Sequence, residues 1–121
     1  MKKLNYAIES GRLIVRDESS GLLLWSGDFD GCTVFKIVPL AGAEACLVLL
    51  DPGSSKQPTF ENLLLVSPSG VVHWKARLPR TNDAFTDVVM RGVQIEARTW
   101  NGIRVQVDAR TGHTKETGFT K

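Results

Sequence analysis

The sequence runs LIVRDESSGLLLW over residues 13–25 and LLLVSPSGVVHW over residues 63–74, and a third copy, IRVQVDARTGHT, covers residues 103–114. Each copy places a polar turn and a glycine between two strand-like segments. In the first two copies a tryptophan follows the glycine by four residues, and the third copy has Glu116 at that position. The glycines, Gly21, Gly70 and Gly112, are 49 and then 42 residues apart. The chain is therefore built from repeats of one supersecondary unit.

The rest of the chain shows short apolar runs that are interrupted every eight to twelve residues by Gly, Pro, Ser, Asn or Asp. No helical periodicity persists, so the pattern predicts an all-β antiparallel meander. The expected strands cover residues 4–9, 12–17, 22–27, 33–39, 45–50, 62–67, 71–77, 86–90, 93–99, 103–108 and 113–118. We expect a single domain over residues 1–121, with repeat-like segments at 12–50 and 62–108 joined by a mobile loop at 51–61.

Two hairpins can be placed in register from the pattern of apolar residues. A Ser10-Gly11 turn pairs Ile8 with Leu13 and Tyr6 with Val15 on one face. In the second hairpin, a three-residue loop at 100–102 with a left-handed Gly102 puts the apolar residues of both strands on one face, and it sets Arg98 opposite Arg104. A register slip by one residue would turn every side chain to the opposite face, so burial selects this loop.

Three other segments are apolar on both faces: residues 22–25, 47–50 and 63–66. Such segments are typical of central strands that are covered on both sides. The 93–108 hairpin instead has one charged face, which we expect to remain in solvent.

The repeat resembles the quinoprotein-type propeller repeat, Asp-x-x-Thr-Gly-Lys-x-x-x-Trp. Residues 108–112 match its turn, and Gly21 to Trp25 and Gly70 to Trp74 match its glycine–tryptophan spacing. The resemblance implies that the glycine makes the turn and that the tryptophan docks neighbouring blades, which concerns fold and not activity. Two to three repeats are too few for a closed ring of about four blades or more. The expected architecture is a small sandwich, an open barrel or a partial propeller, unless a homodimer completes a ring.

The composition argues for an ordinary globular domain. The chain has 121 residues, 42% hydrophobic and 23% charged, with a net charge of +2. This balance gives little reason to expect nucleic-acid binding. The first residues lack the apolar core of a signal peptide, and no segment approaches the ~20 apolar residues of a membrane span. We expect a bacterial-type cytoplasmic protein in which Cys32 and Cys46 are buried free thiols, although the sequence also allows a disulfide between them.

The residues that could carry chemistry are sparse. His73 and His113 are the only histidines, and no metal-ligand spacing occurs, so we expect no metal, no cofactor and no catalytic residue. Asp28-Phe29-Asp30-Gly31 joins two expected strands. Phe29 is either a recognition anchor or a core residue folded back under the turn, and we favour the second interpretation.

The residue types that dominate protein interfaces gather in the loops of the C-terminal part. Residues 75–121 hold nine basic and five acidic side chains. Arg98 opposite Arg104 needs an acidic neighbour, either Glu96 on the same face or a partner surface. The expected partner-binding residues are Arg98, Arg104, Trp100, Asn101, Arg80, Asp83 and Phe29.

Together these features predict a protein that binds another protein without catalysis. The most concrete version is an immunity or inhibitor protein that neutralises a toxin by occluding its active site. One alternative is a homodimeric, propeller-like scaffold or ligand-binding protein. A second alternative is a nucleic-acid binder that uses the arginine-rich C-terminal hairpin.

Overall fold

The computed structural model describes residues 3–40 and 44–119, and within them the chain forms eleven strands and one short 3-10 helix. The elements are β1 (Leu4–Glu9), β2 (Arg12–Asp17), β3 (Leu23–Gly27), β4 (Val34–Pro39), β5 (Cys46–Leu50), η1 (Pro52–Ser54), β6 (Leu63–Val66), β7 (Val72–Lys75), β8 (Phe85–Arg91), β9 (Gln94–Thr99), β10 (Ile103–Val107) and β11 (Thr114–Phe119). The all-β prediction is confirmed, and every expected strand is present with ends shifted by at most two residues.

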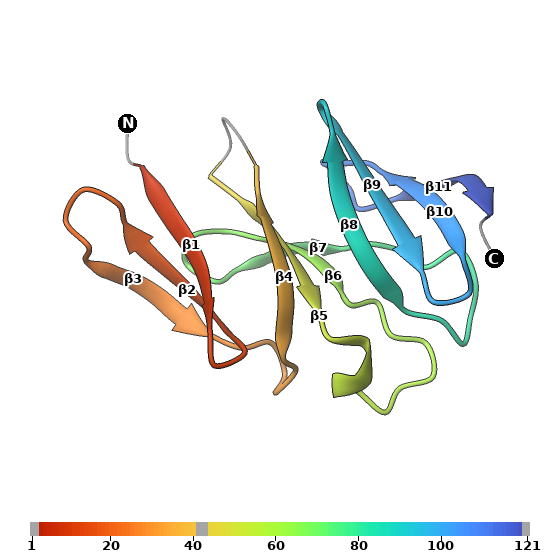
Figure 1. Cartoon of the computed structure of the whole chain (residues 1–121), viewed down its shortest axis with the longest axis horizontal. Helices are drawn as coiled ribbons and strands as arrows, with labels where there is room; N and C mark the ends of the chain where they lie inside the picture. Colours follow the sequence, from red (N-terminus) through yellow and green to blue (C-terminus); the bar gives the residue numbers. More distant parts are fainter. Residues whose placement is uncertain (1–2, 41–43, 120–121) are drawn as a thin grey trace.

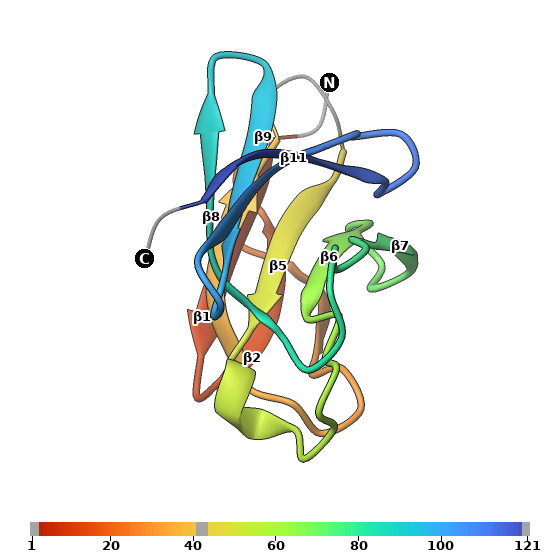
Figure 2. The same ribbon diagram turned by 90° about the vertical axis from the view of Figure 1, so that its right-hand side faces the viewer.

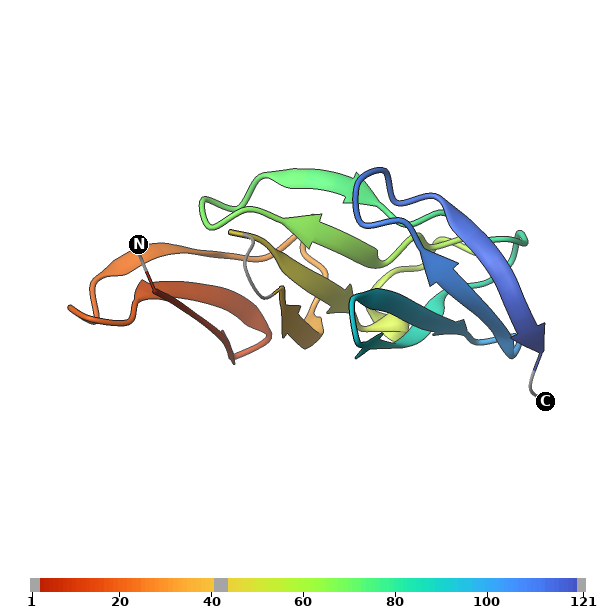
Figure 3. The same cartoon turned by 90° about the horizontal axis from the view of Figure 1, so that it is seen from above.

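The strands form three antiparallel meander sheets. Sheet I has the order β1-β2-β3, sheet II the order β4-β5-β6-β7, and sheet III the order β11-β10-β9-β8. The sheets follow one another along the long axis of the molecule in chain order, with sheet I at one end and sheet III at the other (Figures 1 and 3). The structure is therefore an open row of blade-like sheets and not a closed barrel.

Sheet II is buried on both faces, which explains why its two middle strands are apolar throughout. In β5, Cys46, Val48 and Leu50 belong to the core shared with sheet I. The alternate residues Leu47 and Leu49 belong to the core shared with sheet III. The prediction of covered central strands is thus confirmed for residues 47–50 and 63–66, because successive side chains of a strand point to opposite faces.

The same prediction is wrong for residues 22–25. They lead into β3, which is an edge strand of sheet I, and Leu22 is 63% exposed. The run is apolar because Leu24 and Trp25 pack against the core between sheets I and II, not because both faces are covered.

Both hairpins have the expected register. Tyr6 pairs with Val15 and Ile8 with Leu13, while Arg98 pairs with Arg104. Gly102 has φ +89°, so the 100–102 loop has the left-handed glycine that the apolar pattern required.

The repeated glycines and tryptophans join neighbouring sheets. A Cβ on Gly70 would overlap the indole of Trp25, and one on Gly112 would lie 2.8 Å from Cε3 of Trp74. The Trp74 Nε1–H also donates to the carbonyl of Ala109 at 2.9 Å. Each tryptophan thus packs on the turn glycine of the next sheet, as the resemblance implied.

The series of glycine–tryptophan contacts stops at both ends of the row. A Cβ on Gly21 would meet no atom within 4 Å. In sheet III the tryptophan position holds Glu116, whose Oε1 lies 2.9 Å from Arg80 Nη2. Neither end therefore presents the indole-on-glycine contact that joins the sheets internally.

The repeat boundaries differ from the expected segments at 12–50 and 62–108. The sheets span residues 4–27, 34–75 and 85–119, and the loop at 51–61 lies inside sheet II, where it joins β5 to β6. A long connection between neighbouring strands looks like a boundary in sequence, because loop length carries no information about which strands pair. Sheet I has only three strands because it lacks a counterpart of β4 and β8.

Candidate functional site

Three loops meet at one end of sheets II and III, at the bottom of Figure 1. They are the segment from η1 to Phe60, the segment at 82–84 before β8, and the 100–102 loop between β9 and β10. Backbone N–H of Phe60 donates to the carbonyl of Asp83 at 3.0 Å, and N–H of Asn82 donates to Thr59 Oγ1 at 2.8 Å. The loop that follows β5 is thus fixed to the start of sheet III.

Asn62 also connects the two sheets at this end and is fully buried. Its Nδ2 donates to the carbonyls of Leu50 and Phe85 at 2.7 and 2.8 Å, and its Oδ1 accepts from N–H of Phe85 at 2.7 Å. The Asn62 side chain therefore joins the backbone at the end of β5 in sheet II to the backbone at the start of β8 in sheet III. The sequence pattern places Asn62 at the start of the expected strand 62–67, and nothing in that pattern indicates a side chain that connects two sheets.

Trp100 lies at the tip of the β9–β10 loop with 75% of its surface exposed. The backbone N–H of Trp100 donates to the carbonyl of Ala84 at 2.8 Å. The side-chain Nδ2 of the neighbouring Asn101 donates to the carbonyl of Asn82 at 3.2 Å. The backbone beneath the indole is thus fixed while the ring remains in solvent. This exposure argues against the alternative in which the Trp100 ring packs over Ile103.

Asp83 lies directly beneath this loop and is only 4% exposed. Its Oδ1 accepts from N–H of Ala84 at 2.9 Å and from N–H of Asn101 at 3.1 Å. Its Oδ2 has no hydrogen-bond partner among the described residues. The structure therefore brings together three of the expected interface residues, Asp83, Trp100 and Asn101.

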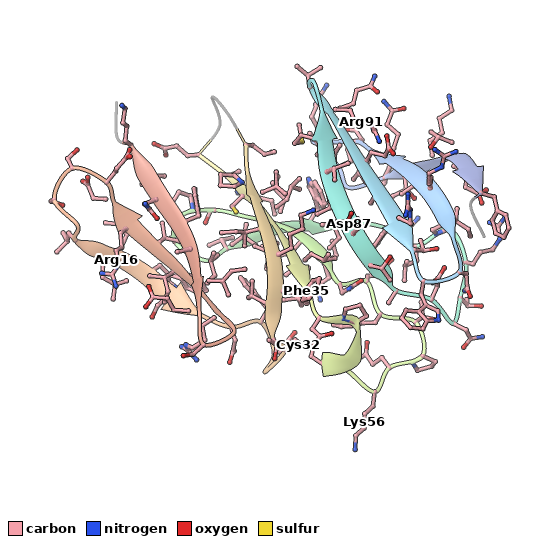
Figure 4. The ribbon with its side chains drawn as sticks, in the orientation of Figure 1. Arg16, Cys32, Phe35, Lys56, Asp87 and Arg91 are labelled. Atoms are coloured by element: carbon pink, nitrogen blue, oxygen red, sulfur yellow. The ribbon has the colours of Figure 1, made fainter. Side chains whose placement is uncertain are left out.

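A shallow groove of about 310 Å³ runs beside Trp100, and we call it the Trp100 groove. It is lined by Pro52, Gly53, Gln57, Pro58, Phe60, Asn82, Asp83, Ala84 and Trp100. Lys56 lies on the same loop but extends away from it into solvent (Figure 4). The aromatic and proline side chains make the walls apolar, and Asp83 is the one charged side chain among the described residues that line the groove.

A second hollow of about 420 Å³, the Cys32 hollow, shares Gln57 and Phe60 with the Trp100 groove. Four charged side chains line it: Asp28, Asp30, Glu61 and Lys75. The Cys32 Sγ lies at its base, 3.9 Å from the carbonyl oxygens of Asp30 and Ser54.

Phe29 is not an exposed anchor. It is 9% exposed, and its ring centroid lies 5.8 Å from that of Trp25 within the core between sheets I and II. Asp28 instead forms an ion pair with Arg12 at 3.5 Å. The interpretation in which Phe29 folds back beneath the turn is therefore the one that the packing supports.

Arg98 and Arg104 flank the 100–102 loop on the outer face of sheet III, and neither lines the Trp100 groove. Sheet III is the one nearest the viewer in Figure 2. The acidic neighbour of Arg98 is Asp87, its cross-strand partner on β8. Burial opposes the charge of Asp87, but hydrogen bonds from Lys36 and from N–H of Val88 outweigh it, and together with the charges of Lys36 and Arg98 they lower the pKa of this carboxyl.

Glu96, one of the two acidic neighbours considered for the arginine pair, forms its ion pair with Arg91 at 2.7 Å. Arg104 packs flat over Gly118, where no side chain intervenes. Arg80 is likewise engaged by Glu116 and belongs to neither hollow. These three arginines thus serve packing and charge pairing within sheet III and its flanking loops.

The nucleophilic and metal-binding residue types do not converge. Cys32 and Cys46 are buried free thiols, and burial raises the pKa of Cys46 to about 12. His73 and His113 are both exposed, on β7 and in the loop before β11. Within residues 3–40 and 44–119, no group of three or more His, Cys, Asp or Glu side chains could hold a metal ion.

No helix in the described part of the chain has the length and apolar character needed to cross a membrane.

A family model described as a domain of unknown function (DUF7957) matches residues 34–119. This match runs from the first residue of β4 to the last residue of β11, and so covers sheets II and III in full. The chain belongs to this family. The DUF7957 region includes both the Trp100 groove and the arginine face of sheet III, while sheet I lies outside it. No curated protein has a sequence that matches the chain.

Two solved structures of designed proteins resemble this DUF7957 protein. The crystal structure of the computationally designed Ika4 protein has a TM-score of 0.68 and 15% identity, over 99% of this chain and 69% of that one. The computationally designed Ika8 protein has a TM-score of 0.61 and 16% identity, over 94% of this chain and 32% of that one, so this chain spans about a third of its length. At these identities the likeness shows the fold alone.

Proposed function

We propose that this protein is a non-catalytic protein-binding domain that contacts its partner through the loop end around Trp100. The observation that carries the proposal is the 75% exposure of an indole on a loop whose backbone is fixed by hydrogen bonds to the 82–84 segment. Exposing a large apolar ring is unfavourable, and tryptophan is enriched among residues that dominate binding energy. A rigid loop also reduces the entropy lost on association.

Two features favour binding over catalysis. The thiol of Cys46 is held protonated by burial, which is typical of an inert structural cysteine. Neither His73 nor His113 is among the described residues that line the Cys32 hollow or the Trp100 groove.

More concretely, we propose that the partner is a bacterial toxin domain, met in the cytoplasm, whose active site this protein occludes. The loop end, whose loops are joined by hydrogen bonds between Phe60 and Asp83 and between Asn82 and Thr59, suits an inhibitor that inserts one edge into a cleft. On sheet III, Asp87 lies opposite Arg98 and forms an ion pair with Lys36 at 2.7 Å, so this face already carries charges of both signs, and we favour the loop end for the contact.

We also propose that the repeats are related to quinoprotein-type propeller blades. The indole-on-glycine contacts of Trp25 with Gly70 and of Trp74 with Gly112 support this relation, because they give the repeated residues the packing role expected in such blades. The relation concerns the scaffold and carries no quinone site.

The proposal is tested by recovering the partner from the native cell with tagged protein and measuring binding of the purified pair. We expect Trp100→Ala to weaken binding at least tenfold, since a central tryptophan contributes about 2 kcal/mol or more. Phe119→Ala is the matched control, because Phe119 is also an exposed aromatic but lies at the end of β11.

Equal binding by both variants would remove the loop end from the interface. Recovery of only a second copy of the chain would favour the homodimeric scaffold. Recovery of DNA or RNA with an affinity that falls steeply with salt would favour the nucleic-acid alternative.

A further inference from the structure

The turn at Gly21, between β2 and β3, has the same hydrogen bonds as the turn at Gly112, between β10 and β11. In each, the glycine N–H donates to the carbonyl of the aspartate that opens the turn, Asp17 or Asp108, at 2.8 Å. The side chain of each aspartate accepts from the N–H two residues on, at 2.9 and 2.8 Å. The N–H after each glycine donates to the hydroxyl of the residue before it, at 3.2 Å in both turns. Turns closed by the same local bonds follow the same backbone path.

The Gly112 turn shows what a turn of this kind holds. Trp74 lies against the glycine, where an added Cβ would be 2.8 Å from its Cε3, and its Nε1–H donates to the carbonyl of Ala109 at 2.9 Å. The equivalent acceptor in the Gly21 turn is the carbonyl of Glu18, which likewise lies three residues before the glycine. The Gly21 turn therefore has both parts of an indole site, a bare glycine and a carbonyl acceptor.

The Gly21 turn is nevertheless empty. Of the three tryptophans of the chain, Trp25 and Trp74 pack on other turns, and Trp100 lies at the loop end. A Cβ on Gly21 would meet no atom within 4 Å, and among the described residues none donates a hydrogen bond to the carbonyl of Glu18. Both residues are exposed, in the loop at the far left of Figure 1. The site is thus open to solvent.

We propose that the Gly21 turn binds a tryptophan side chain of a protein partner, with the ring on Gly21 and the indole N–H on the carbonyl of Glu18. Tryptophan suits the site better than a smaller apolar side chain, because it supplies both a flat ring and a donor. The site takes one side chain and not a whole sheet. Arg16 holds the position that Val107 has before the Gly112 turn, and its charge opposes burial against a sheet. The site is separate from the Trp100 groove.

The turn is held in place before a ligand arrives. The N–H of Glu18 donates to the carbonyl of Lys3, and the N–H of Asp17 donates to the carbonyl of Leu22, both at 2.9 Å. Preorganisation of this kind favours binding because the site does not have to be ordered on association. Leu22 and Leu23 follow the glycine and are both exposed, so apolar surface adjoins the turn in the chain.

The test titrates isotope-labelled protein with N-acetyl-tryptophan amide and follows the backbone amide shifts by NMR. We expect saturable shifts at residues 18–22, with a dissociation constant in the millimolar range, since a single side chain buries little surface. The N1-methyl analogue keeps the ring but cannot donate, and we expect it to bind about threefold to tenfold more weakly. This comparison of two probes uses the unaltered protein.

A pair of variants locates the site. Gly21→Ala places a Cβ where the ring would lie and is expected to weaken probe binding about tenfold or more. Gly92→Ala is the matched control, because Gly92 has a similar φ, +63° against +71°, and equally open surroundings, but lies in the β8–β9 turn. It should leave probe binding unchanged. The purified partner should likewise bind Gly21→Ala about fivefold or more weakly and Gly92→Ala normally.

Equal binding of the two probes, shifts confined to the Trp100 groove, or unchanged binding of probe or partner to Gly21→Ala would overturn the inference. A rise in molecular mass that Gly21→Ala abolishes would assign the site to a second copy of the chain and overturn the assignment to a partner. Trp100→Ala separates this site from the proposed function, because it should weaken binding of the partner and leave the shifts at residues 18–22 unchanged.

Discussion

The glycines of the repeat differ in what a side chain would meet, although all three have positive φ. Gly21, Gly70 and Gly112 have φ of +71°, +83° and +79°. Any side chain in this region of backbone space is disfavoured by about 1–2 kcal/mol. Only Gly70 and Gly112 also lie against an indole, so only they carry the packing between sheets.

We therefore expect Gly112→Ala to lower the free energy of unfolding by about 3–4 kcal/mol, because the added Cβ would press on Trp74 as well as strain the backbone. Gly21→Ala should lower the free energy of unfolding by only about 1–2 kcal/mol, because it strains the backbone but meets no neighbouring side chain. Denaturant unfolding of both variants measures the difference. Equal losses would show that the tryptophan contact contributes nothing to the packing of sheet III on sheet II.

Tyr6 offers a second test at the scale of one residue, since its hydroxyl is buried without a partner among the described residues. Burial is the main cause that raises the pKa of Tyr6 to about 12 from its usual 10.0, and the neighbouring Cys46 and Glu44 act in the same direction. The folded state thus favours the neutral phenol. The stability that depends on this group is constant below pH 10 and is lost as the pH rises toward 12.

Tyr6→Phe should leave the stability at neutral pH unchanged or raise it by about 1 kcal/mol, since it removes an unsatisfied polar group. The variant should also lose less stability than the wild type between pH 10 and 12. Urea unfolding at pH 8 and pH 11 measures both effects. A variant that is markedly less stable at pH 8 would mean that the hydroxyl has a partner.

At the scale of elements, the junction between sheets II and III depends on one buried amide. Asn62 makes three hydrogen bonds to backbone groups of Leu50 and Phe85. Removing it leaves those buried groups unsatisfied, and each such group costs about 1–3 kcal/mol. The junction also positions Asp83 and Trp100, so its loss should propagate to the loop end.

We expect Asn62→Ala to lower the free energy of unfolding by about 3 kcal/mol or more and to increase hydrogen exchange at residues 82–85 and 100–102. Asn101→Ala, which loses one partly exposed side-chain bond, is the matched control and should cost about 1 kcal/mol or less. A small effect of Asn62→Ala would indicate that water or a neighbouring side chain satisfies the same groups.

The hairpins illustrate what local pattern can determine. The register of β9 and β10 follows from the alternation of Ile95, Ala97, Val105 and Val107, because only one loop length buries all four on one face. The role of residues 22–25 does not follow, since an apolar run is equally compatible with a central strand and with an edge strand that packs on one core.

At the scale of the whole molecule, the outer faces of both end sheets carry charged side chains. The outer face of sheet III carries Arg98, Arg104 and the Arg91–Glu96 pair, and Glu116 occupies the position of a docking tryptophan. The outer face of sheet I carries the Arg16–Glu9 pair. Burying such charges against another sheet would cost desolvation free energy, and we expect the packing of a tryptophan on a turn glycine not to offset it.

We therefore expect a monomer of 13.3 kDa in solution at micromolar concentration. Light scattering coupled to size exclusion measures the mass directly. A stable dimer would contradict this expectation and would restore the homodimeric propeller as the better description of the assembly.

The sequence by itself determined the strands, the two hairpin registers, and the glycine and tryptophan positions of the repeat. These features are local or periodic, and burial of alternating side chains leaves few other solutions. Which strands form one sheet, the placement of the 51–61 loop inside sheet II, and the edge position of β3 were decided only by tertiary structure. The same holds for the groove, in which Asp83 and Trp100 lie 17 residues apart in sequence and meet with Phe60 because Asn62 fixes one loop to another sheet. Contacts of that kind depend on where separate loops converge in space, and the spacing of residues along the chain does not predict where that is.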